Sequence, residues 1–170
     1  MIEMKNIYAI QRTMHARFRK NSKKGQIVNY LGKKFIVYPD VFWPSEDSMA
    51  LIKNFKIKKN EEVLDLCTGS GVIAIYSKLK GAKKVVALDI NPNAIKSTKK
   101  NAIKHKVKID ARLSDMFTAL KENEKFDVIT MNPPFTEHKT KDYAEKTVWD
   151  EKLKVHKAFF KNVKKYLKEN

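Results

Sequence analysis

Apolar and polar positions follow a regular pattern from about Glu62 onward. Short apolar runs alternate with segments in which apolar residues recur every three or four positions. The runs predict strands and the spaced segments predict helices. The predicted strands are EVLDL (62–66), KVVALDI (84–90), VKIDARL (107–113) and KFDVITM (125–131); the predicted helices are GVIAIYSKL (71–79), PNAIKSTKKNAIKH (92–105) and a short helical stretch before residue 125. Strands alternating with helices favour an α/β fold with a doubly wound, mainly parallel sheet.

The segments on either side of this core have other patterns. Residues 2–20 carry apolar side chains at helical spacing, with basic residues on the remaining face, and QIVNY (26–30) and KKFIVYP (33–39) predict a hairpin around LG. We expect residues 1–40 to form a basic extension of one helix and one hairpin, and residues 41–170 to form the main domain. Residues 143–168 predict one long core-facing helix, because large side chains, apolar apart from one histidine, step along it by four and three. These are Trp149, Leu153, His156, Phe160, Val163 and Leu167.

Length and composition restrict the class of protein. The chain has 170 residues, enough for one domain and short for two. It has neither an apolar run long enough for a membrane span nor a basic-then-apolar leader, so we expect a cytoplasmic protein with no membrane partner. A single cysteine, Cys67, cannot form an internal disulfide, and the four histidines show no metal-ligand spacing, so no metal site is predicted.

The chain is strongly basic. Its formal charge is +17 and its pI is about 9.8, which favours an anionic partner such as RNA, DNA or a ribosomal complex. Lysine spread along the whole chain is equally typical of compositional bias or of a heat-adapted surface. Three of the four arginines, Arg12, Arg17 and Arg19, are clustered near the N-terminus, where forked phosphate contacts are one interpretation. A solvated face on a packing helix is the other interpretation.

Polar and glycine residues gather at the ends of the four predicted strands. In an open parallel sheet ligands bind outside these ends. The first end has Asp65 followed by Gly69 and Gly71, and missing side chains there allow a ligand to approach the backbone. Asp89 at the second end can accept hydrogen bonds from both hydroxyls of a ribose, and Asp115 at the third can accept one from an amino group such as that of adenine. The fourth end carries Asn-Pro-Pro-Phe, residues 132–135, which predicts a stiff, extended corner.

These motifs carry a resemblance to a known family. VLDLCTGSG, ALDINP, SDMF and NPPF resemble the motifs of class I S-adenosylmethionine-dependent methyltransferases, over about residues 36–168. The NPPF element resembles the subset that methylates planar nitrogens. Within that subset VFWPSEDSMALI and DINPNAIKSTKKNA are similar to the release-factor glutamine methyltransferases. The resemblance implies a Rossmann-like sheet and S-adenosylmethionine as the cofactor.

The resemblance also implies residue roles. Gly69 and Gly71 would pass beneath the methionine part of the cofactor, with Asp65 near its amino group. Asp89 would hold the ribose and Asp115 the adenine. The implied cofactor set is completed by Thr68, Ile90, Met116 and Asn132. In the implied catalytic set, the Asn132 side-chain oxygen and the Pro133 carbonyl accept hydrogen bonds from an amide or amino nitrogen, and Phe135 stacks on the planar group.

The sequence departs from the pattern of this family in two places. Cys67 and Thr68 stand where many relatives have a smaller pair. The chain stops at KKYLKEN, where a fifth strand is expected, so we expect either a fragment or a minimal domain whose sheet lacks its last strands. We therefore expect the N-terminal hairpin, a small partner or self-association to cover the edge of the fourth strand.

Several alternatives stay open. The acceptor is a glutamine amide of a translation-related protein, or an exocyclic amine of adenine or guanine in RNA or DNA. Gly69-x-Gly71-x-x-Ala74 followed by Asp89 also fits the loose fingerprint of an NAD-dependent oxidoreductase, and the charge fits a catalytically inactive RNA- or ribosome-binding module.

Two loops also have two interpretations each. In one interpretation of FWPSEDS, Phe42 or Trp43 covers the adenosyl group of the cofactor. In the other, the segment is a hydrophobic staple and Ser45 caps the next helix. Glu137 and His138 contact substrate, or they are solvated loop positions.

Overall fold

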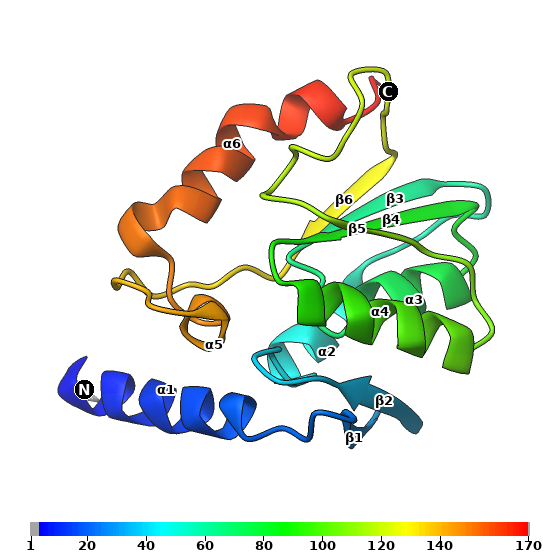
Figure 1. Ribbon diagram of the computed structural model, residues 1–170. Coiled ribbons are helices and arrows are strands. Elements are labelled where there is room, and N and C mark those ends of the chain that lie inside the picture. Colours follow the sequence, from blue (N-terminus) through cyan, green and yellow to red (C-terminus); the bar gives the residue numbers. More distant parts are fainter. Residues whose placement is uncertain (1–3, 170) are drawn as a thin grey trace.

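A parallel sheet forms the centre of the computed structural model, which describes residues 4–169 (Figure 1). Its strands are β3 (Glu62–Leu66), β4 (Lys84–Asp89), β5 (Asp110–Leu113) and β6 (Val128–Met131). They are all parallel and lie in the order β5-β4-β3-β6. The predicted α/β sheet is thereby confirmed, with β5 and β6 shorter than the apolar runs that predicted them.

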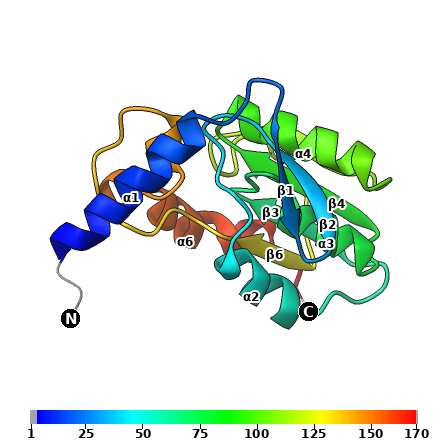
Figure 2. The same cartoon turned by 90° about the horizontal axis from the view of Figure 1, so that it is seen from below.

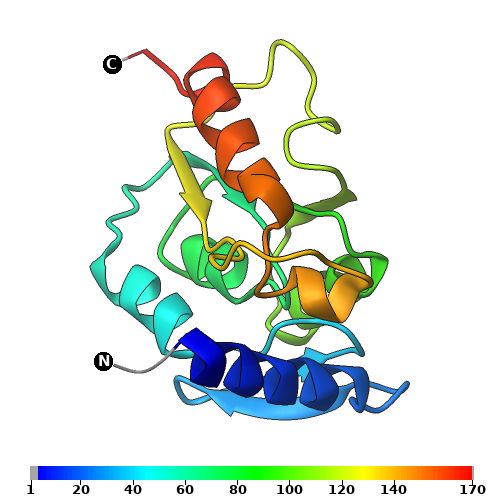
Figure 3. The same ribbon diagram turned by 90° about the vertical axis from the view of Figure 1, so that its left-hand side faces the viewer.

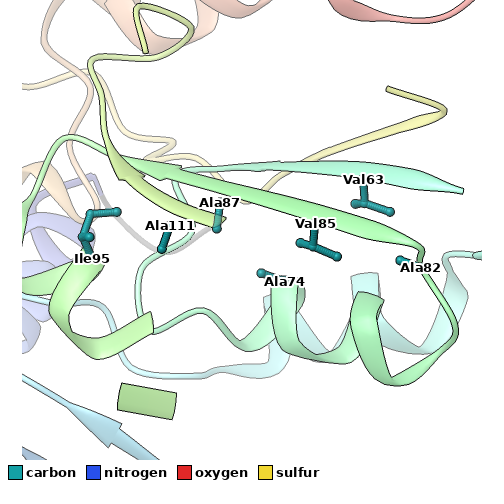
Figure 4. Packing of buried hydrophobic residues seen from close by; sticks show 7 residues of the cluster. All are labelled: Val63, Ala74, Ala82, Val85, Ala87, Ile95 and Ala111. Atoms are coloured by element: carbon teal, nitrogen blue, oxygen red, sulfur yellow. The ribbon is translucent and has the colours of Figure 1, made fainter. Parts of the chain in front are cut away.

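Helices cover both faces of this sheet, as a doubly wound fold requires. The helices α3 (Val72–Leu79) and α4 (Pro92–Lys104) lie on one face and α6 (Lys154–Tyr166) lies on the other (Figures 1 and 3). Because side chains alternate along a strand, neighbouring residues serve different cores. On the α3 and α4 side the buried cluster is Val63, Ala74, Ala82, Val85, Ala87, Ile95 and Ala111 (Figure 4). On the α6 side it is Leu64, Leu66, Val86, Leu88, Phe117, Phe126 and Tyr166.

Local sequence explains where the central helices begin. The α4 helix has proline at its first position, and the side chain of Asn91 caps it by accepting a hydrogen bond from the Asn93 N–H at 2.9 Å. The α3 helix begins after Gly71, whose φ of 80° lies in the left-handed region. A Cβ at this position would lie 2.8 Å from the Thr98 side chain, so α3 and α4 meet closely there.

The N-terminal part consists of α1 (Met4–Arg19) and a hairpin of β1 (Gln26–Tyr30) and β2 (Lys33–Val37). Residues 2 and 3 of the predicted helix lie outside the described residues. The hairpin packs on α4, since the Asn101 side chain bonds the backbone N–H and C=O of Ile36 at 2.7 and 2.8 Å. The division of the chain at residue 40 stays a prediction.

The prediction that the hairpin covers the edge of β6 is wrong. The hairpin forms a sheet of its own on the far side of α4. At the start of β6, Phe126 instead makes a parallel bridge to Leu167, with the Phe126 N–H donating to the Tyr166 carbonyl at 2.9 Å. Cover by a partner chain stays a prediction.

The single helix predicted over residues 143–168 is also wrong. The chain forms α5 (Tyr143–Lys146), a 3-10 turn η1 (Glu151–Leu153) and then α6. Between α5 and η1 the chain turns at residues 147–148 and then pairs with the segment that follows the proline corner, through a bridge between Thr136 and Trp149. Phe160 is 73% exposed, because α6 packs against the sheet through Phe159, Val163 and Tyr166.

None of the helices within residues 4–169 combines the length and the apolar character needed to cross a membrane.

Candidate active site

A cleft of about 560 Å³ lies at the carboxyl ends of β3, β4 and β6. The strand order reverses here, because β4 and β5 extend from one side of β3 while β6 lies on the other. Ligands of doubly wound folds bind at such a switch point. The remaining walls are residues 40–48, which lead into α2 (Glu46–Asn54), and the segment after β6. Figures 1 and 2 show the course of these two segments of the backbone.

The turn after β3 supplies the floor of the cleft. Thr68 donates its N–H to the Leu88 carbonyl at 3.0 Å, which ties the turn to β4. Gly69 has a φ of 56°, and a Cβ built there would meet nothing closer than the Phe42 carbonyl oxygen at 4.0 Å. Its open side lets a ligand come close to the backbone. Cys67 also lines the cleft and has a φ of 54°, a conformation that costs a residue with a side chain about 1 kcal/mol.

Asp65 does not line the cleft. Its side chain is fully buried, and its carboxylate accepts hydrogen bonds from the hydroxyls of Thr68 at 2.6 Å and Thr130 at 2.8 Å. Burial raises the pKa of Asp65 to about 6, although these hydrogen bonds favour the ionised form. The cofactor contact of Asp65 that the family resemblance implies stays a prediction. Asp65 joins the ends of β3 and β6 beneath the turn.

Asp89 lines the cleft at the end of β4. One carboxylate oxygen accepts from the Gly69 N–H and the other from the Asn91 N–H, both at 2.9 Å. Each oxygen keeps a further lone pair, so the pair can still accept from two hydroxyls. Burial raises the pKa of Asp89. Ile90, 38% exposed, lines the cleft next to it.

The third strand end adds Asp115 and Met116, which both line the cleft. Asp115 is exposed, and the backbone turns sharply at Met116, whose φ is 48°. Ser114 holds this turn, because its hydroxyl donates to the Met116 carbonyl at 2.8 Å. The ends of β4 and β5 therefore face the same cavity, as the sequence predicted.

The proline corner completes the cleft. All four of its residues, Asn132, Pro133, Pro134 and Phe135, line it. The Asn132 amide nitrogen donates to the Ser48 hydroxyl on α2 at 3.3 Å. Phe135 is held by its backbone N–H, which donates to the Val148 carbonyl at 3.0 Å, while the residue as a whole is left 62% exposed. The corner thus presents one fixed amide and one open aromatic face.

A buried polar link supports the wall beyond the corner. Gln11 of α1 donates to the Thr136 hydroxyl at 2.6 Å and accepts from the Trp149 indole N–H at 2.7 Å. His138 stacks on Trp149 with ring centroids 4.0 Å apart. Neither Glu137 nor His138 lines the cleft, which favours the interpretation that they do not contact substrate.

Two of the clustered arginines are engaged within the chain. Arg19 forms ion pairs with Asp142 at 2.8 Å and Glu145 at 3.1 Å, and the Arg17 guanidinium lies 3.8 Å from the centre of the Trp43 ring. These contacts favour a packing role for α1 over the phosphate-binding interpretation.

The FWPSEDS segment before α2 is interpreted from its sequence either as a cover over the cofactor or as a staple in which Ser45 caps the helix. Phe42, Trp43 and Pro44 line the cleft. Ser45 precedes α2, but its hydroxyl makes no capping bond and is buried without a partner in the described residues. Sequence reasoning missed Ser48, Trp149 and Gln11 as parts of the site. Their side-chain contacts, with Asn132, with Thr136 and between Gln11 and Trp149, join residues 84 to 138 positions apart, so no local pattern could have indicated them.

The residues present fit S-adenosylmethionine. The cleft has the size of small-molecule sites, its glycine floor is open, and Asp89 keeps acceptor capacity for ribose hydroxyls. The reversing parallel sheet and its strand ends agree with the class I S-adenosylmethionine-dependent methyltransferases, and the comparison with known families supports this class. The chain belongs to the family described as methyltransferase small domain, whose model matches residues 44–170.

Known proteins are similar to this chain over part of their length. A Methanocaldococcus jannaschii protein provisionally named protein N5-glutamine methyltransferase is 44% identical over 109 residues, which cover 64% of this chain and 54% of that protein. The release factor glutamine methyltransferase of Koribacter versatilis is 33% identical over 126 residues, covering 71% of this chain and 45% of that protein. The chain thus spans about half the length of the curated relatives it matches.

Solved structures show the same fold. A tRNA methyltransferase of M. jannaschii superposes with a TM-score of 0.63 and 26% identity, covering 85% of this chain and 40% of that one. A T. thermophilus 16S rRNA methyltransferase in complex with AdoMet and guanosine gives a TM-score of 0.65 at 24% identity, covering 85% and 39%. The latter likeness concerns the fold alone.

Proposed function

We propose that this chain transfers a methyl group from S-adenosylmethionine to a planar nitrogen, namely a glutamine side-chain amide of a translation-related protein. The observation that carries the proposal is the shared cleft of Asp89 and Asn132. A carboxylate suited to a ribose and a rigid amide suited to a planar nitrogen lie on one cavity. The printed names of the two curated relatives support glutamine as the acceptor.

The roles of the residues follow from their chemistry. Bound S-adenosylmethionine would supply a methyl group on a positively charged sulfur. Its transfer would exchange the carbon–sulfur bond for a carbon–nitrogen bond, release S-adenosylhomocysteine and free one proton from the acceptor nitrogen to solvent. Gly69 and Asp89 hold the cofactor, while the Asn132 side-chain oxygen and the Pro133 carbonyl accept hydrogen bonds from the N–H groups of the acceptor. Accepting both bonds raises the electron density on that nitrogen and fixes its direction. Positioning of this kind and fixed electrostatics provide most of the rate in such displacements.

Phe135 supplies the stacking surface for the planar acceptor. The residue is 62% exposed and lines the cleft although its backbone N–H is bonded to Val148, so a stacking surface is available at little cost in ordering. No covalent enzyme intermediate is needed.

A second acceptor is favoured by other observations. The tRNA methyltransferase neighbour and the charge of +17 support RNA as the substrate, where the proline corner would equally suit an exocyclic amine of adenine or guanine. Against it stands the internal use of Arg17 and Arg19. The membership of the chain in a methyltransferase family counts against the NAD-dependent oxidoreductase.

Methyl transfer to a cell extract tests the proposal. The protein is incubated with extract and S-adenosylmethionine labelled in its methyl group, and the label is followed after protease or ribonuclease treatment. We expect protease-sensitive, ribonuclease-resistant label in which the methyl group is on glutamine nitrogen. Ribonuclease-sensitive label would establish the RNA acceptor, and absence of label with intact binding of S-adenosylhomocysteine would favour the inactive binding module. Tighter binding of NADH than of S-adenosylhomocysteine would overturn the methyltransferase assignment.

A further inference from the structure

Ser48 has a contact with the proline corner that gives it a role in the reaction. We propose that Ser48 is a positioning residue, which holds the Asn132 amide so that its oxygen is directed at the acceptor nitrogen. This inference rests on the proposed function and adds to it a residue on a different element.

Ser48 is well placed for this role. It lies in α2, it is only 4% exposed, and it lines the same cleft as Asn132. Its hydroxyl oxygen is 3.3 Å from the Asn132 amide nitrogen, across 84 positions of sequence. Ser48 lies in α2 and Asn132 follows β6, so their contact persists only if α2 keeps its position relative to the sheet.

The position of α2 is fixed by its own packing. Ile52 is buried in a cluster with Phe35 and Ile73, which belong to the hairpin and to α3. At its N-terminal end, the Tyr30 hydroxyl donates to the Ser45 carbonyl at 2.8 Å. Ser48 is therefore presented from a helix held at both ends.

The hydrogen-bonding chemistry of the Ser48 hydroxyl and the Asn132 amide relates their contact to the orientation of the amide. A carboxamide has an oxygen that accepts and a nitrogen that donates. When the Ser48 hydroxyl accepts from the nitrogen, the Asn132 oxygen is turned to the other side and stays an acceptor. The flipped amide would present N–H groups to the N–H groups of the substrate, which is repulsive. In the structure Ser48 accepts from this nitrogen, so the Asn132 amide has the orientation that the proposed reaction needs.

The first test observes the hydrogen bond without activity. The side-chain NH₂ signals of Asn132 are assigned by NMR from their disappearance in Asn132→Asp. We expect Ser48→Ala to shift these signals and to speed their exchange with water. Ser48→Thr, which keeps the hydroxyl, should restore both. The matched control is Ser45→Ala, which removes a hydroxyl of the same segment that bonds to nothing in residues 4–169, and it should change neither.

The second test measures the rate of methyl transfer to the protein that takes up label from S-adenosylmethionine in the cell extract. Ser48→Ala should lower the rate about 3- to 10-fold, as expected for one lost hydrogen bond, while the affinity for S-adenosylhomocysteine stays within about twofold. Ser48→Thr should recover most of the rate. In the Asn132→Ala background, Ser48→Ala should have no further effect, because Ser48 acts through Asn132.

Each outcome decides between the two claims. Unchanged Asn132 signals in Ser48→Ala, or a loss that adds to that of Asn132→Ala, would overturn the positioning role and leave the proposed function intact. A normal rate in Asn132→Ala would overturn the proposed function and the catalytic part of this inference together. The NMR signals would in that case still report whether the hydrogen bond exists.

Discussion

The aspartates at the ends of β3 and β4 differ in their surroundings and therefore in their roles. Asp65 is enclosed and bonds two threonine hydroxyls, so it supports the turn from below. Asp89 lines the cleft and bonds two backbone N–H groups, so it can also meet a ligand. The sequence identified both residues but could not separate the buried one from the accessible one.

The first prediction concerns the pH dependence of stability. The pKa of Asp65 is about 6 in the folded chain and 3.8 as an ordinary value, so between these values the folded chain holds a proton that the unfolded chain has lost. The contribution of this group is therefore fully present below pH 4 and declines as the pH rises through 6, by about 3 kcal/mol at most. Urea unfolding at several pH values should show this decline for the unmodified chain relative to Asp65→Asn. Parallel pH profiles of the two proteins would contradict the assignment.

The second prediction concerns Asp89. The two oxygens of Asp89 accept from two backbone N–H groups and are available to the ribose hydroxyls. In Asp89→Asn one of these oxygens is replaced by an NH₂ group, which would face a backbone N–H donor. Loss of charge-assisted hydrogen bonds should weaken S-adenosylhomocysteine binding about 10- to 100-fold in calorimetry. The control is Asp110→Asn, at a position on β5 outside the cleft, which should bind normally. Equal binding by Asp89→Asn and the unmodified chain would remove Asp89 from the site.

At the scale of elements, α1 supports the acceptor side of the cleft. Gln11 is 3% exposed and uses both ends of its amide, on Thr136 and on Trp149. Arg19 adds ion pairs to the α5 region. The helix thus holds the segment that follows the proline corner.

This contact gives the third prediction. Gln11→Ala leaves the Trp149 indole N–H and the Thr136 hydroxyl without their partner, which should lower the free energy of unfolding by about 2–4 kcal/mol. Arg12→Ala, at the next and exposed position of the same helix, should cost less than about 0.5 kcal/mol. Both are measured by urea unfolding. Similar losses from the two variants would show that the amide link is not what attaches α1.

The elements that could be predicted from the sequence are those fixed by local patterns. The strands and helices between β3 and β6 have clear periods, and Pro92 and Gly71 mark helix starts. The helix predicted over 143–168 failed because helical spacing does not reveal that Val148 pairs with Phe135. Ser48 was missed for the same reason, since its partner is distant in sequence. Non-local pairing overrides local preference at the acceptor side of the site.

At the scale of the whole molecule, the charge of +17 dominates the long-range field. It favours non-specific association with RNA, which weakens with salt as counterions are released. Because Arg17 and Arg19 contact Trp43 and two carboxylates instead, we do not assign this binding to them.

The fourth prediction follows. The dependence of RNA affinity on salt, measured by fluorescence anisotropy with a labelled single strand, should have nearly the same slope in Arg17→Ala/Arg19→Ala as in the unmodified chain. Two lost phosphate contacts would instead reduce the slope by about 1.4. A reduction of that size would reassign α1 to nucleic-acid binding.

The central claim is that one cleft divides its work between a cofactor side around Asp89 and an acceptor side around Asn132. The most direct measurement compares Asn132→Ala with the unmodified chain in two quantities, turnover in methyl transfer and affinity for S-adenosylhomocysteine. We predict that turnover falls by about two orders of magnitude or more while the affinity changes less than about threefold. Equal losses in both quantities, or no loss in turnover, would contradict the account.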